Sequence, residues 1–261
     1  MSTVAAGSPV QVERSEGICT VTLARPPVNA LDDALVDALQ SAVAAASADR
    51  DLSVLHLRSS ARVFCAGADL ALMQRSIRTP GGVEEMLALV GRLQELAWCI
   101  ERSPLVSIAE IGGAALGGGF ELALACDLRI AAQEAKVGLP EAALGLLAAA
   151  GGTQRLTRLA GPGIARRLIL GAETVDGATA ERLGLVQWSL PRAELAPVAR
   201  ALAERIATLP RAATGAAKQC IAAAQDEGRD GFAEEIAHTR RLYRHPVTRA
   251  RVAAFLARSP R

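Results

Sequence analysis

The chain has 261 residues, of which 51% are hydrophobic and 21% charged, so it can bury one large core. Its formal net charge of +2 gives no general positive field, which argues against a nucleic-acid partner or an anionic membrane. Only three histidines occur, and none is spaced with acids or cysteines as a metal site requires, so we expect no metal.

Five cysteines are scattered without a C-x-x-C pair (Cys19, Cys65, Cys99, Cys126 and Cys220), a pattern typical of reduced cytosolic thiols. The first ten residues have no basic residue before an apolar run, so neither a secretory signal nor a transit peptide is expected. No charge-free apolar stretch approaches the ~18 residues of a membrane span. We therefore expect a cytoplasmic protein with no membrane partner.

Strand and helix patterns alternate over most of the chain. In chain order they predict strands over 10–13 and 17–24, a helix capped by Asp32 or Asp33 to about 47, a strand at 54–57, a helix from about 83 to 101, a strand at 105–111, a helix at 118–126, strands at 128–132 and 136–139, helices at 151–161, 163–170 and 178–183, and a strand at 186–190. The chain after Arg192 is predicted to be helical, with breaks at Pro210 and Gly228. This alternation predicts an α/β core over residues 1–195 and a helical C-terminal region over residues 196–261.

A glycine-rich corner opens the stretch ALGGGFELALACD at residues 115–127. Gly117, Gly118 and Gly119 allow close backbone approach, and the apolar run after them predicts a buried helix. The start of such a helix leaves N–H groups unpaired and attracts negative charge. The corner can therefore bind a phosphate, a carboxylate or an oxyanion.

Two acids lie in apolar surroundings near this corner. Glu121 can be a helix cap or a catalytic group, and Glu141 can be a helix-start or surface acid or a catalytic group. Carboxylates are seldom buried without a partner or a task, so the pair favours acid–base chemistry. A third acid, Glu110, is predicted to be a surface residue at a strand end.

Other catalytic signatures are absent from the sequence. There is no G-x-G-x-x-G, no P-loop and no G-x-S-x-G elbow. Taken alone, FCAGADL at 64–70 is a turn after a strand. Cys65 and Cys126 are interpreted as small buried apolar residues rather than nucleophiles.

Several motifs together resemble the crotonase, or enoyl-CoA hydratase/isomerase, family. They are FCAGADL at 64–70, ALGGGFELALACDLRIA at 115–131, KVGLPEAALGL at 136–146, GGTQRL at 151–156 and ERLGLV at 181–186. Their order and spacing agree from ARPPVNALD at 24–32 to VAAFLARSP at 252–260. The resemblance implies an α/β spiral core of ββα repeats, with C-terminal helices that pack in a homotrimer or a dimer of trimers.

The resemblance also implies a site for a coenzyme A thioester. Its carbonyl would accept hydrogen bonds from the backbone N–H groups of Ala68 and Gly118, each worth roughly 3–4 kcal/mol to an enolate. Glu121 would act on the water that attacks Cβ, and Glu141 on the proton at Cα. Further substrate-binding positions would be Arg25, Ala66, Asp69, Leu70, Leu116, Pro140 and Leu144.

This resemblance predicts an enoyl-CoA hydratase that makes a 3-hydroxyacyl-CoA. No metal or redox cofactor is expected, because coenzyme A is part of the substrate. An isomerase that works with the acid at Glu141 alone stays open, as does a dehydratase working in reverse. A non-catalytic or RNA-binding homologue is the alternative from another class.

Two regions leave the partner chemistry open. Residues 147–150 read Leu-Ala-Ala-Ala where relatives usually show an Ile-Pro-Gly type of sequence, so the acyl preference is not predicted. The C-terminal region has no acid after Glu235 but seven arginines: 240, 241, 244, 249, 251, 258 and 261. A solvated helix face is favoured over binding of coenzyme A phosphates. RNA binding is third, because aromatic stacking partners are lacking.

Overall fold

The computed structural model describes residues 8–258 and contains two sheets. The larger sheet has the order β1-β2-β3-β4-β6-β9, with bounds β1 Val10–Ser15, β2 Ile18–Leu23, β3 Val54–Ser59, β4 Val106–Ile111, β6 Leu128–Ala132 and β9 Trp188–Leu190. Only β1 runs antiparallel to its neighbour, and the strands from β2 to β9 are parallel. A smaller sheet joins β5 (Ala115–Leu116), β7 (Lys136–Gly138) and β8 (Thr174–Asp176).

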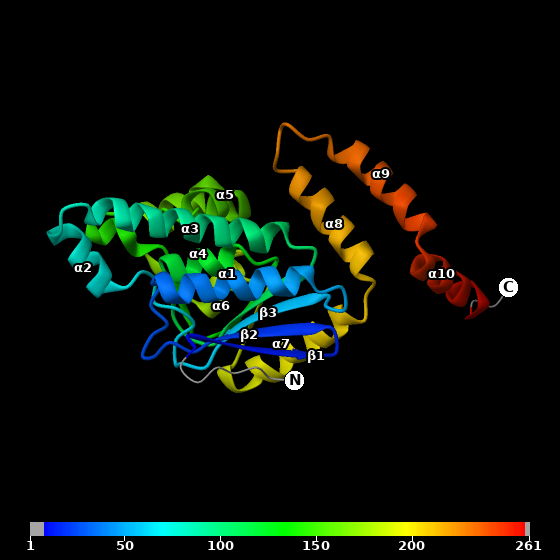
Figure 1. Ribbon diagram of the computed structural model, residues 1–261, viewed down its shortest axis with the longest axis horizontal. Helices are drawn as coiled ribbons and strands as arrows, with labels where there is room; N and C mark the ends of the chain where they lie inside the picture. The colour runs from blue at the N-terminus through cyan, green and yellow to red at the C-terminus, as the bar shows by residue number, and fades with distance from the viewer. Residues whose placement is uncertain (1–7, 259–261) are drawn as a thin grey trace.

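Helices cover both faces of the larger sheet (Figure 1). On one side lie α1 (Asp33–Ala48) and α3 (Gly82–Arg102), and on the other lies α7 (Arg192–Ala207). Because both faces are covered, Val54, Leu55 and Leu57 of β3, a strand predicted from the sequence, are all fully buried.

Shorter helices and turns connect the two sheets to the outer layer. Their bounds are α2 Leu70–Arg78, α4 Gly118–Leu124, η1 (a 3₁₀ helix) Pro140–Leu144, α5 Gly152–Leu170 and α6 Gly177–Arg182. Helix α1 begins at its predicted cap, where Asp32 accepts the N–H of Leu35 at 2.9 Å. Helix α2 was not predicted from the sequence, because it buries only Ser76 and so shows no apolar stripe.

The predicted break between helices at 151–161 and 163–170 is confirmed, because α5 is interrupted at Gly161, whose φ of 79° and ψ of 164° are not helical, just before Pro162. Two other local predictions need correction. Helix α4 ends at Leu124 rather than at residue 126. Glu110 is not a surface residue, because β4 lies inside the sheet between β3 and β6. Only 9% of Glu110 is exposed, and its Oε2 lies 2.9 Å from Nε2 of His56.

The C-terminal region is helical, as predicted, with α8 (Arg211–Ala223), α9 (Gly231–Arg244) and α10 (Pro246–Arg258). The predicted boundary at 195/196 falls inside α7, and α8 is the first helix to leave the sheet. Lys218 attaches α8 to the core through Asp127 at 2.8 Å and the carbonyls of Ile100 and Leu105, each at 3.0 Å. Beyond it, α9 and α10 project away from the sheets (Figure 1). No helix within residues 8–258 has the length and apolarity needed to cross a bilayer.

Candidate active site

The glycine corner connects β5 to α4. Gly117 has φ 52° and ψ −129°, a backbone conformation that suits glycine, and its N–H donates to the carbonyl of Gly138 at 3.0 Å. A Cβ on Gly117 would lie 2.8 Å from Oε1 of Glu141, and one on Gly118 would lie 3.8 Å from Oε2 of Glu121. The corner therefore brings the two predicted catalytic acids to the same two glycines.

The loop after β3 packs directly against this corner. The N–H of Leu31 donates to Gly67 at 2.8 Å, and the N–H of Leu116 donates to Cys65 at 3.0 Å. A Cβ on Gly67 would lie 2.9 Å from the carbonyl oxygen of Leu116 and 3.5 Å from the nitrogen of Gly118. The space beside Gly67, whose φ is 96°, is thus closed to a side chain.

Two backbone donors remain free where the loop and the corner meet. Ala68 follows Gly67, and Gly118 is the first residue of α4, so its N–H has no partner inside the helix. Neither N–H has a hydrogen-bond acceptor among the described residues. This arrangement can bind an oxyanion, and the role of the pair as an oxyanion hole stays a prediction.

Glu121 is buried at the start of α4, with 4% of the residue exposed. Its Oε1 accepts the N–H of Gly152, the first residue of α5, at 2.7 Å. Burial raises the pKa of the Glu121 carboxyl to about 7. The Gly152 N–H opposes this rise, whereas the negative charge of Glu141 adds to it. A carboxyl that titrates near pH 7 can accept or donate a proton under ordinary conditions.

Glu141 lies in the first turn of η1, after Pro140. Burial raises the pKa of its carboxyl too. Its Oε2 is buried and has no hydrogen-bond partner among the described residues. An unpaired carboxylate oxygen beside a second titrating acid is suited to holding a water molecule or a substrate proton.

Arg25 and Asp69, both predicted to bind substrate, contact each other. Nη2 of Arg25 lies 2.9 Å from Asp69 and 2.8 Å from Asp32, the caps of α2 and α1. Asp69 accepts the N–H groups of Ala71 and Leu72, and the Leu72 bond is the main cause that lowers the pKa of its carboxyl. Both side chains are therefore engaged in holding the loop in place.

The other predicted substrate-binding positions surround the corner and are more open to solvent. Ala66, Leu70 and Leu144 are exposed, the last two by 71% and 66%, whereas Leu116 and Pro140 are half-buried. Their contacts with a substrate stay predictions. All six described arginines after Glu235 are exposed in the single chain, and Arg261 lies outside the described residues.

Three residues near the site, Gly152, Arg155 and Glu101, had no role predicted from the sequence. Gly152 and Arg155 belong to the GGTQRL motif, which carried the family resemblance but offered no chemical role. Arg155 donates to both carboxylate oxygens of Glu101, at 2.7 and 2.9 Å, and to the carbonyl of Ala150 at 2.9 Å. The Gly-Gly pair before a predicted helix could have indicated a role for this turn in the site, because it resembles the glycine corner at 117–119.

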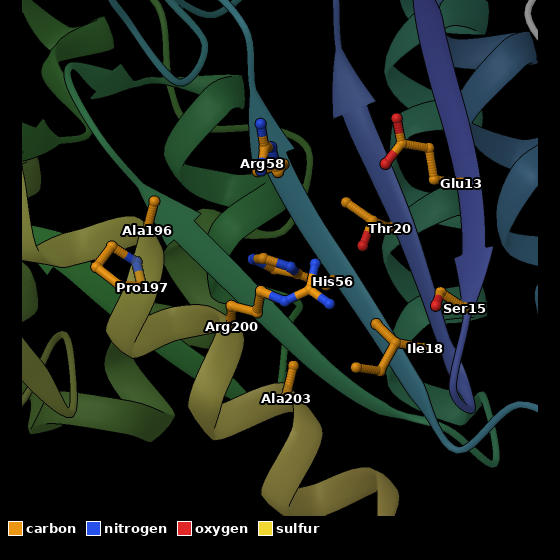
Figure 2. A pocket seen from close by; sticks show the side chains of 10 residues that line it. All are labelled: Glu13, Ser15, Ile18, Thr20, His56, Arg58, Ala196, Pro197, Arg200 and Ala203. Atoms are coloured by element: carbon orange, nitrogen blue, oxygen red, sulfur yellow. The ribbon is translucent and has the colours of Figure 1, made fainter. Parts of the chain in front are cut away.

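A separate cavity of about 260 Å³ lies between the sheet and α7 (Figure 2). His56 from β3 and Arg200 from α7 extend into it, and Arg58, Glu13 and Thr20 also contribute to its lining. None of the predicted site residues lines this cavity. The candidate active site is therefore the region around Gly117 and Gly118.

Comparison with known proteins gives the family. Residues 13–257 match the family model described as "Enoyl-CoA hydratase/isomerase". The chain belongs to this family. A Mycobacterium tuberculosis protein named a probable enoyl-CoA hydratase is 37% identical over 235 residues, covering 90% of this chain and 88% of the relative. The Escherichia coli 2,3-dehydroadipyl-CoA hydratase is 37% identical over 226 residues, covering 86% of each chain.

Similar solved structures confirm the crotonase-like fold. The enoyl-CoA hydratase from Bacillus anthracis superposes with a TM-score of 0.89 at 32% identity, over 95% of this chain and 96% of that one. The Pseudomonas aeruginosa protein DspI gives a TM-score of 0.88 at 35% identity, over 98% and 99% of the two chains. Family membership and fold, both expected from the motifs, are thus confirmed.

Proposed function

We propose that this protein is an enoyl-CoA hydratase, which adds water to the double bond of a 2-enoyl-CoA and forms a 3-hydroxyacyl-CoA. One observation carries the proposal: two acids, the buried Glu121 and the half-buried Glu141, flank the glycine corner that also presents an unpaired N–H. Membership of the hydratase/isomerase family and the names of its relatives support the substrate class.

In the proposed reaction the thioester carbonyl accepts hydrogen bonds from the N–H groups of Ala68 and Gly118. Charge moves onto this oxygen as the enolate forms, so fixed donors lower the barrier, by roughly 3–4 kcal/mol each. Both are backbone groups on rigid segments, which keeps their geometry constant during the reaction.

The two carboxyls divide the proton transfers. Glu121 as carboxylate takes a proton from water while the hydroxyl oxygen forms its bond to Cβ, and the electron pair of the double bond moves toward the thioester oxygen. Glu141 in its protonated form then gives a proton to Cα. Burial raises the pKa of both carboxyls, and the negative charge of Glu141 adds to the rise for Glu121. Both shifts favour retention of a proton, which this division requires on one of the two acids.

The reaction consumes only the thioester and water, so we propose that it needs no metal or redox cofactor. We also propose a homotrimer or a dimer of trimers. Phe232 and Tyr243 of α9 are 84% and 72% exposed in the single chain, and such apolar area on a projecting helix favours a protein–protein contact. Light scattering should give three or six times 27.1 kDa, and a monomer would contradict this. The expected cytoplasmic location stays a proposal.

Mixing the protein with crotonyl-CoA tests the function directly. A hydratase removes the absorbance of the conjugated enoyl thioester, and the rate should scale with enzyme concentration. No loss with short, long, branched or aromatic enoyl-CoAs would contradict the proposal. Retention of RNA by such an inactive protein would favour the non-catalytic alternative.

Double-bond isomerisation is the second candidate. The observation in its favour is the unpaired Oε2 of Glu141, because one free base can move a proton along an acyl chain. Conversion of a 3-enoyl-CoA by a Glu121→Gln variant that no longer hydrates would support this second activity. If Glu121→Gln loses hydration and isomerisation equally, the isomerase candidate is rejected and hydration remains the one proposed function.

A further inference from the structure

Arg155 joins three parts of the structure near the candidate active site. It lies in the first turn of α5, with 9% of the residue exposed. Two of its nitrogens contact both carboxylate oxygens of Glu101 on α3, at 2.7 and 2.9 Å, and Nη1 donates to the carbonyl of Ala150 at 2.9 Å. A planar guanidinium in such a two-pronged pair has one fixed orientation.

The segment that Arg155 holds is also the one that contacts Glu121. Ala150 is followed by Gly151, whose φ of 106° requires glycine, and then by Gly152, whose N–H donates to Glu121 at 2.7 Å. A Cβ on Gly152 would lie 2.8 Å from Oε1 of Glu121, so this backbone approaches the carboxylate closely. A shift of the turn by a few tenths of an ångström would weaken the bond.

The positive charge of Arg155 favours the ionised form of Glu121, as does the hydrogen bond from the turn that Arg155 holds. The groups that affect the charged form of Glu121 are Glu141, which disfavours it, and the Gly152 and Ala150 amides and Arg155, which favour it. Arg155 is the one cation in this set. Its partner Glu101 accepts from Nε and Nη2, whereas Nη1 contacts the Ala150 carbonyl, so all three nitrogens of the guanidinium are engaged.

We propose that Arg155, held by Glu101, is a positioning residue that fixes the turn at 150–152 so that the Gly152 N–H remains on the Glu121 carboxylate. Its catalytic consequence rests on the proposed hydratase function, whereas the effect on Glu121 itself does not. Arg155 acts through the turn and touches no reacting atom.

A matched control is available on the same aromatic ring. The guanidinium carbon of Arg155 lies 5.8 Å from the ring centroid of Trp98, and that of the exposed Arg102 lies 4.6 Å from it. No hydrogen bond joins Arg102 to residues 150–152 within the described chain. Arg102→Met therefore removes a cation from the same ring without disturbing the turn.

The titration of Glu121 in full-length protein labelled with ¹³C at the glutamate carboxyls tests the proposal. With Arg155→Met the Glu121 midpoint should rise by about one pH unit, and the Gly152 amide should lose protection from hydrogen exchange. With Arg102→Met both should match the wild type. An unchanged midpoint and unchanged protection in Arg155→Met, or equal changes in both variants, would overturn the proposal.

Arg155→Lys keeps the cation but cannot hold Glu101 and the Ala150 carbonyl in the same fork. We expect a smaller upward shift of the Glu121 midpoint and partial loss of Gly152 protection. Wild-type values for Arg155→Lys would show that charge alone matters and would overturn the positioning role. Because this variant preserves charge and most of the side-chain volume, it also serves if Arg155→Met does not fold.

The pH profile of crotonyl-CoA hydration separates this proposal from the proposed function. If the wild type hydrates, the acidic limb of kcat/KM should move to higher pH in Arg155→Met by the same amount as the titration. If no substrate is hydrated but the titration still shifts, the proposed function fails and the positioning role stands. If the wild type hydrates and kcat/KM of Arg155→Met is lower by the same factor at every pH, Arg155 has only a structural role and the positioning proposal is wrong.

Discussion

The N–H of Gly152 donates to Oε1 of Glu121 at 2.7 Å, although the two residues are 31 positions apart in the chain. The bond connects the start of α5 to the start of α4, so two helix N-termini meet at one carboxylate. Both termini favour the charged form, and burial opposes it. This balance sets the protonation of Glu121 and underlies the first two predictions.

The rate of hydration should fall on the acidic side of about pH 7. Because Glu121 must be ionised to take a proton from water, kcat/KM should fall roughly tenfold per pH unit below the pKa of about 7. The measurement is a pH–rate profile with crotonyl-CoA at subsaturating concentration. A profile flat from pH 5 to pH 8 would contradict the assignment of Glu121 as the base.

Stability should also depend on the charge of Glu121. Its folded pKa of about 7 exceeds the ordinary 4.5, so the unfolded chain ionises first as the pH rises. Below pH 4.5 the carboxyl is protonated in both states; between 4.5 and 7 the free energy of unfolding falls, by roughly 3 kcal/mol in all. In urea denaturation, the free energy of unfolding of Glu121→Gln should therefore rise relative to that of the wild type between pH 5 and pH 8. A constant difference between the two proteins across this range would contradict the raised pKa.

Each acid should be essential for hydration. Glu121→Gln and Glu141→Gln keep the side-chain size but remove the proton transfers, so kcat should fall by about 10²–10⁴ with thioester binding largely retained. Stopped-flow hydration and calorimetric titration with a saturated acyl-CoA separate these effects. Loss of binding with unchanged kcat would assign the acids to substrate contact instead.

The glycine corner and both acids were predicted from residue chemistry, because glycines and acids in apolar runs are unusual, and the family motifs added the loop that carries Ala68. Local patterns also predicted most strands, because apolar runs and turn residues are read within a few positions. Arg155 and Glu101 could not be paired from the sequence, since they are 54 positions apart and charged residues on helices are usually exposed. Glu110 was wrongly predicted to be a surface residue for a related reason. Its partner His56 belongs to a neighbouring strand, and the order of strands in a sheet cannot be predicted from a local sequence pattern.

Crowding at the turn gives a steric prediction. Gly152→Ala would place a Cβ 2.8 Å from Oε1 of Glu121, so the carboxylate or α5 must move and hydration should fall at least tenfold. Gly163→Ala in the same helix is the matched control, because a Cβ there meets nothing within 4 Å. Its activity should equal that of the wild type. Equal activity of both variants would mean that the turn does not hold Glu121.

Arg129 should be a major stabilising residue away from the reaction. It is 3% exposed and donates to the carbonyls of Leu185, of Ala123 in the last turn of α4, and of Cys126 just after this helix. The Ala123 carbonyl also accepts the N–H of Cys126, but Arg129→Met leaves the carbonyls of Leu185 and Cys126 unpaired and should cost about 3 kcal/mol in urea denaturation. Changing the exposed Arg167, which pairs with Glu173, to Met should lower the free energy of unfolding much less, because solvent screens this ion pair. Similar losses in the two variants would contradict the role of Arg129.

Oxygen transfer from solvent tests the central claim most directly. Crotonyl-CoA incubated with the protein in H₂¹⁸O should yield 3-hydroxybutyryl-CoA that carries one ¹⁸O atom at C3, as mass spectrometry can detect, and Glu121→Gln should yield almost none. A product without ¹⁸O, or a shifted double bond with no hydroxyl, would contradict the hydratase assignment.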